Sequence, residues 1–142
     1  MESNIALLQP VVLLVLWSLI MWLWMYATRI PAIISAKMKL DPNAPSGSQM
    51  AQLPANVRWK ADNYNHLMEQ PTIFYAIVLA LVFLGNNSDL SIYAAWAYTV
   101  LRIIHSLVQV TINKIELRFA IFVLSNVPLF VLTINAALRV FA

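Results

Sequence analysis

The chain has 142 residues, of which 61% are hydrophobic and 11% are charged, and its mean hydropathy is +0.74. A soluble domain of this length cannot bury so much apolar surface, so the composition indicates an integral membrane protein. The chain has no cysteine, which excludes redox chemistry by its own thiols and zinc–thiolate sites. The net charge of +3 comes from basic residues at predicted helix ends and not from a basic run, so we expect no nucleic-acid partner.

Four apolar stretches predict an all-α, four-helix membrane bundle that forms a single domain, with spans at about 5–34, 58–85, 91–115 and 118–140. The polar segment 35–56 is predicted to be a cytoplasmic loop that is either disordered or folded over a site. Basic residues flank the first and third loops but not the second. The positive-inside rule therefore places both chain ends on the outer side of the membrane.

The predicted helix 58–85 is polar in its first half. Four polar residues there are spaced four, three and four apart, which puts them on one face: Arg58, Asp62, Asn65 and Glu69. A charged group exposed at mid-bilayer costs ~2.5–3.5 kcal/mol, so this stripe is expected to face protein, a wet cavity or a ligand. Pro71 removes one backbone hydrogen bond and is expected to kink the helix just above Glu69.

The predicted helix 91–115 carries a second polar stripe that starts with Arg102, His105 and Gln109. At a helical rise of about 1.5 Å per residue, Glu69 and His105 lie at one depth and Arg102 lies near mid-membrane. We therefore predict a Glu69–Arg102 ion pair, which lowers the cost of holding both charges in the membrane. In the last span, Asn126 and Asn135 are expected to make interhelical hydrogen bonds.

Three elements resemble a known family: the run Ala61–Pro71 with its Glu69-Gln-Pro71 ending, the Arg102-Ile-Ile-His105 element, and Arg118-Phe. They are similar to the MAPEG family, the membrane-associated proteins in eicosanoid and glutathione metabolism. The family includes microsomal glutathione transferases, leukotriene synthases and many bacterial members. The likeness extends over essentially the whole chain in length, span count and loop pattern, and the chain looks like a bacterial-type member. This implies residence in a bacterial inner membrane.

The resemblance also implies a homotrimer that binds glutathione as co-substrate between neighbouring subunits, at the cytoplasmic half. By resemblance, Glu69 holds the glutathione amino group, Arg102 and His105 line the site, and Arg118 stabilises the thiolate. Lys37 matches a basic position that meets a carboxylate. Three further candidate ligands stand where the chain departs from the family pattern of Arg-Asn-x-x-Glu and of a tyrosine four residues after the histidine: Asn65, His66 and Gln109.

These residues leave three functions open. The first is a glutathione-dependent transferase or peroxidase that takes lipophilic electrophiles from the membrane. The second is a small-molecule exporter or proton-coupled carrier that uses Glu69 as its membrane carboxylate. The third is a non-catalytic trimer that binds lipid. Structural roles are also open at single positions, because Arg118 can be an anchor that reaches the interface and His105 a buried hydrogen-bond partner.

Overall fold

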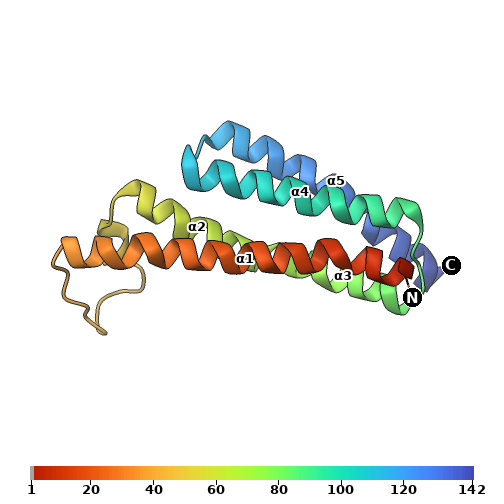
Figure 1. The fold of residues 1–142 in the computed structure, drawn as a ribbon, viewed down its shortest axis with the longest axis horizontal. Helices are drawn as coiled ribbons and strands as arrows, with labels where there is room; N and C mark the ends of the chain where they lie inside the picture. The colour runs from red at the N-terminus through yellow and green to blue at the C-terminus, as the bar shows by residue number, and fades with distance from the viewer. Residues whose placement is uncertain (1) are drawn as a thin grey trace.

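The computed structural model describes residues 2–142, and their side chains from residue 4. It is all-helical, and its elements in chain order are α1 (Glu2–Ser35), the 3₁₀ helix η1 (Met50–Gln52), α2 (Ala55–Glu69), α3 (Pro71–Phe83), α4 (Asp89–Thr111) and α5 (Ile115–Phe141). Helix α1 runs the length of the molecule beside α2 and α3, which follow one another in the opposite direction (Figure 1). Helices α4 and α5 form an antiparallel pair against them. Both chain ends therefore lie at the same end of the bundle (Figure 1).

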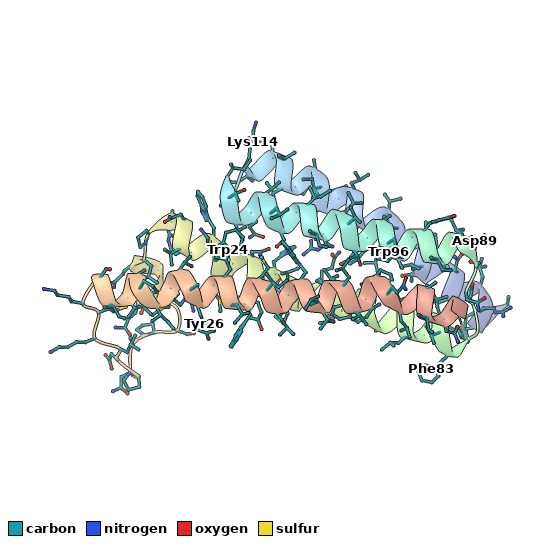
Figure 2. All side chains as sticks on the ribbon, viewed as in Figure 1. Trp24, Tyr26, Phe83, Asp89, Trp96 and Lys114 are labelled. Carbon is teal, nitrogen blue, oxygen red and sulfur yellow. The ribbon has the colours of Figure 1, made fainter. Side chains whose placement is uncertain are left out.

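Three segments are long and apolar enough to cross a membrane: Asn4–Ser35, Ala55–Phe83 and Ile115–Phe141. Large apolar side chains are exposed all around the bundle, and Phe83, which projects from its lower edge in Figure 2, is 90% exposed. A helical surface that is apolar on its outer side is suited to lipid. Helix α4 falls outside this set because Arg102 and His105 lower its hydropathy, although it lies alongside α5. The protein is thus an integral membrane protein.

The expected single helix over 58–85 is two helices with a break at Gln70. Pro71 opens α3 and has no N–H to donate to the carbonyl of Leu67. At the break, the carbonyl of Glu69 accepts a hydrogen bond of 2.6 Å from the side-chain hydroxyl of Thr72. Gln70 keeps helical backbone angles, so α2 and α3 continue in the same general direction (Figure 1). The break falls next to Glu69, where the proline predicts it.

Side chains from all the helices pack the apolar core. An aromatic contact in this core joins Phe74 of α3 to Tyr98 of α4, whose rings stack with centroids 4.3 Å apart. Leucines and a methionine of α1 complete this core from the other side, since Leu7, Leu14 and Met21 repeat at the seven-residue spacing of one helix face. The core holds α1, α3 and α4 together at the end of the bundle that carries the chain termini.

The segment between α1 and α2 extends from the end of α1 and returns through η1 to α2 (Figure 1). The Gln49 side chain holds it together, because its Nε2 donates to the Lys39 carbonyl at 2.7 Å and its Oε1 accepts from the Asp41 N–H at 3.0 Å. Arg58 of α2 donates from Nε to the Leu53 carbonyl at 3.0 Å. Of the two possibilities that the sequence left open for this loop, the structure has the folded one, in which the loop lines a cavity.

Candidate functional site

A cavity of about 430 Å³ opens where α2, α4 and the start of α5 meet. This volume lies within the range of about 300–1,000 Å³ that small-molecule sites occupy. Its α2 and α4 sides are polar, and its α5 side combines one arginine with apolar side chains. The lining residues are Asp62, Asn65, His66, Glu69, His105, Gln109, Ile115, Arg118, Phe119 and Phe122. Six of the eight residues predicted from the sequence as site residues line this one cavity. Arg102 and Lys37 do not.

The exposed polar stripe of α2 forms one wall of this cavity. Asp62, Asn65 and Glu69 are exposed side chains at helical spacing, and all three line it. Among the residues that the structure describes, neither carboxylate lies within ion-pairing distance of a basic side chain. The stripe therefore faces a cavity, as its charge requires, and its two carboxylates keep their acceptor capacity for a cationic group.

Arg118 is fixed at the mouth of the cavity by the turn between α4 and α5. Its Nη1 donates to the Oδ1 of Asn113 at 2.9 Å. Asn113 has a positive φ of 47°, a backbone conformation that asparagine tolerates better than most residues. The turn thus uses Asn113 twice, once to reverse the chain and once to orient the guanidinium. This hydrogen bond uses one N–H group of the guanidinium, and the remaining N–H donors are left for a ligand.

Two histidines form the inner wall of the cavity. The rings of His66 and His105 stack with centroids 5.0 Å apart, and Phe122 meets His66 edge-on at 5.4 Å. Behind them, Nη2 of Arg102 lies 2.6 Å from Nδ1 of His66. A guanidinium is only a donor, so Nδ1 must accept and the ring proton of His66 must sit on Nε2. His66 is thereby held neutral, with an N–H donor to offer.

The predicted Glu69–Arg102 ion pair is wrong. Arg102 is fully buried and contacts His66, while Glu69 is exposed on the cavity wall. The helix register explains the difference, because the hydroxyl of Tyr98 donates to Oε1 of Gln70 at 2.8 Å. Residues 66 and 70 therefore face α4, and residue 69 is turned about 100° away from residue 70. The depth estimate gave the level of Glu69 but not its direction.

Arg102 is an unusual feature of the interior. Its Nε and Nη1 are buried and have no hydrogen-bond partner among the residues described. Nearby α2 and α4 side chains are also buried without partners, namely those of Asn63 and Ser106. Burying a guanidinium in this way costs several kcal/mol by general estimates. Such a cost is tolerated most often where a buried charge has a positioning or functional role.

Gln70 joins the helix break to α4 and α5. It accepts from Tyr98 and donates from Nε2 to Oδ1 of Asn126 at 2.6 Å. The predicted interhelical role of Asn126 is confirmed by this bond, and that of Asn135 by its 3.1 Å hydrogen bond to the Ser91 hydroxyl. These two hydrogen bonds fix the rotation of the end of α2 about its helix axis. They therefore also fix the position of Glu69, which is the next residue.

Lys37 is not among the residues that line the cavity. It follows the last turn of α1, is exposed and has a positive φ of 51°. Arg29, which was not predicted as a site residue, lies inside the first apolar span and lines a second cavity. A charged residue within a predicted membrane helix is by itself a signal of function, and that signal was available in the sequence.

The fold and the cavity define an all-α integral membrane protein with a largely polar cavity between its helices. The MAPEG family model matches residues 7–138, nearly the whole chain, and the protein belongs to the MAPEG family. Membership makes it a relative of membrane transferases and peroxidases of glutathione metabolism. Neither a curated protein nor a solved structure matches the chain at a significant level.

Proposed function

We propose that this protein is a glutathione-dependent transferase or peroxidase that acts on lipophilic electrophiles, with glutathione bound in the cavity between α2, α4 and α5. The observation that supports it most is the meeting of six predicted site residues, Arg118 and Glu69 among them, in one cavity. Family membership supports the same class of reaction.

The chemical groups in the cavity complement those of glutathione. The tripeptide has one ammonium group, two carboxylates and a thiol. The free carboxylates of Glu69 and Asp62 suit the ammonium group, and the N–H donor of His66 suits a carbonyl or carboxylate. Arg118 suits the sulfur, because a guanidinium beside a thiol lowers the pKa of that thiol and raises the thiolate fraction.

The proposed reaction has two forms. In a transfer, the thiolate sulfur forms a bond to an electrophilic carbon, and the leaving group departs with the electron pair of the broken bond. In a hydroperoxide reduction, the thiolate attacks the terminal oxygen, and the O–O bond breaks. The alkoxide leaves with the electron pair of that bond and takes a proton from water to become the alcohol. The resulting sulfenic acid then reacts with a second glutathione to give glutathione disulfide and water. The aromatic wall of Phe119 and Phe122 is suited to the apolar second substrate.

We further propose a homotrimer with glutathione between subunits, in the inner membrane and with both termini outside. A single subunit places one guanidinium, that of Arg118, at this cavity, whereas glutathione has two carboxylates. Because Arg118 is assigned to the sulfur, both carboxylates are left without a cation in that subunit, and a cation from a neighbouring subunit would balance one of them. Lys37 suits this role because it is exposed and lies outside the cavity of its own subunit.

The test is calorimetric titration of the purified protein with glutathione, followed by turnover assays with an aryl chloride and with a lipid hydroperoxide. We expect saturable binding together with turnover of one of the two electrophiles. Binding without turnover of either would favour a non-catalytic trimer. Absence of binding at millimolar glutathione, with no gain in thermal stability, would overturn the proposal. The carrier alternative requires substrate flux in proteoliposomes that Glu69→Gln abolishes.

A further inference from the structure

A second cavity, of about 370 Å³, lies beside the first at the loop end of the bundle. It is enclosed by the last part of α1, the loop before α2, and α2 itself: Arg29, Gly47, Met50, Ala51, Arg58, Ala61, Asp62 and Asn65. It shares only Asp62 and Asn65 with the first cavity. The α1 and α2 ends reach beyond the turn between α4 and α5, so α4 and α5 leave this end of the molecule uncovered (Figure 1).

The second cavity is positively charged. Two guanidinium groups, those of Arg29 and Arg58, face one carboxylate, that of Asp62. Within the described part of the chain, neither arginine is ion-paired with Asp62. The Nε of Arg29 is buried and has no hydrogen-bond partner there. Arg58 uses its Nε for the Leu53 carbonyl, which leaves its terminal nitrogens as donors. A net charge of about +1 with unused donors matches a single anionic group.

The loop wall of this cavity is a built structure. Met50 and Ala51 belong to η1, and Gln49, which precedes η1, makes the two hydrogen bonds that close the loop on itself. The bond from Arg58 to the Leu53 carbonyl ties the end of the loop to α2. The second arginine is therefore oriented by the same segment that encloses the cavity.

An exposed aromatic face of α1 leads to Arg29. Trp22 and Tyr26 are spaced four residues apart and Arg29 follows three later, so the three side chains share one face. Both aromatic rings are exposed, by 41% and 38%, and they meet edge to face with centroids 5.2 Å apart. Figure 2 shows Tyr26 on the opposite edge of α1 from Trp24. Aromatic side chains at this depth offer an apolar path that ends at a cationic group.

We propose that the Arg29–Arg58 cavity binds the carboxylate or phosphate head group of an anionic membrane amphiphile whose chain lies along Trp22 and Tyr26. Basic pockets at the ends of membrane helices are suited to such head groups. The site adjoins the glutathione cavity without sharing its basic residues, so it goes beyond the proposed function and does not depend on glutathione binding.

The experiment uses the purified full chain in neutral detergent micelles and measures the quenching of tryptophan fluorescence. The two probes are a brominated fatty acid and the brominated alcohol of the same chain length, which partitions into micelles but has no charge. We expect the acid to saturate at an at least tenfold lower mole fraction than the alcohol, since hydrogen bonds to charged groups are worth about this much. The variant Trp22→Phe should lose most of the saturable signal.

The double variant Arg29→Gln with Arg58→Gln should remove the difference between acid and alcohol. Lys39→Gln, which removes an exposed cation from the same loop but not from the cavity, should keep it. Equal quenching of the wild type by both probes would overturn the proposal, and this comparison holds even if the double variant does not fold. A difference that survives in a folded double variant would overturn it as well.

Competition identifies the ligand. We expect phosphatidylglycerol to displace the brominated acid and inorganic phosphate not to do so. Displacement by phosphate but not by the phospholipid would mean a site for a free anion and would overturn the amphiphile assignment. Displacement by glutathione would assign the two arginines to the tripeptide and overturn it too. A failure of glutathione to bind at all would overturn only the proposed function and leave this result unchanged.

Discussion

The two ends of the bundle differ in how they treat buried polar groups. At the end with the chain termini, Thr99 donates to the Pro10 carbonyl at 2.9 Å and Ser91 accepts from Asn135, while Oδ1 of Asn4 is buried without a partner in the described chain. Towards the loop end, Nε and Nη1 of Arg102, Nδ1 of His105 and Oε1 of Gln109 are buried without partners in the described chain. Native interiors rarely leave such groups unpaired. The unpaired groups thus gather mainly towards the loop end, around the first cavity.

The largest expected effect is on Arg118, at the site end. Arg118→Ala removes the guanidinium proposed to stabilise the thiolate, and we expect turnover to fall by about 100- to 1,000-fold, as when one electrostatic donor is lost elsewhere. Turnover is measured with saturating glutathione. Arg139→Ala, an exposed arginine near the opposite end of α5, is the matched control and should stay near wild type. Equal activity in the two variants would contradict the role of Arg118.

The variant Phe74→Ala tests the packing of the apolar core at the end with the chain termini. Phe74 is fully buried and stacks on Tyr98, so truncation leaves a cavity and should lower the free energy of unfolding by about 3 kcal/mol. Unfolding in detergent, followed by circular dichroism, measures this. Phe83→Ala changes the same residue type at a 90% exposed position and should alter stability by less than about 0.5 kcal/mol. Glutathione affinity should be unchanged in both folded variants, and a parallel loss in both would contradict the division.

Arg102→Met tests whether the buried arginine orients His66. Removal of an unpaired buried charge should leave the fold stable, while glutathione affinity should fall by about tenfold, because the Nε2–H donor of His66 is no longer fixed. Calorimetry measures the affinity. In a His66→Asn background, whose amide does not depend on a tautomer, the same change should have little further effect. Additive losses in the double variant would show that Arg102 acts in some other way.

The smallest effect is expected at Asn113. Asn113→Gly keeps the positive φ of the turn but removes the acceptor that holds Arg118, and we expect turnover to fall by about threefold. Asn113→Asp keeps an acceptor oxygen and should retain or raise turnover. Steady-state assays on both variants measure the change. A larger loss in the aspartate variant than in the glycine variant would exclude a role for the hydrogen bond.

The helical class, the break beside Glu69 and the interhelical bonds of Asn126 and Asn135 could all be predicted from local chemistry. Proline cannot donate a hydrogen bond, and an amide within an apolar span must find a partner. The partner of Arg102 could not be predicted in this way. Glu69 and His66 are three residues apart on α2, which places their side chains about 60° apart around the helix, and depth alone does not give the direction of either. Arg29 was missed because one charge changes the hydropathy of a long apolar span very little.

The sequence by itself determined that this chain enters a membrane as helices and belongs to the MAPEG family, because composition, apolar length and short motifs are local properties. Only the tertiary structure decided which charges meet. The register between α2 and α4 is set by contacts between residues far apart in the chain, such as Tyr98 with Gln70. That register places Arg102 behind His66 and leaves Glu69 on the cavity wall, while the packing of α1 against α2 brings Arg29 and Arg58 to one pocket.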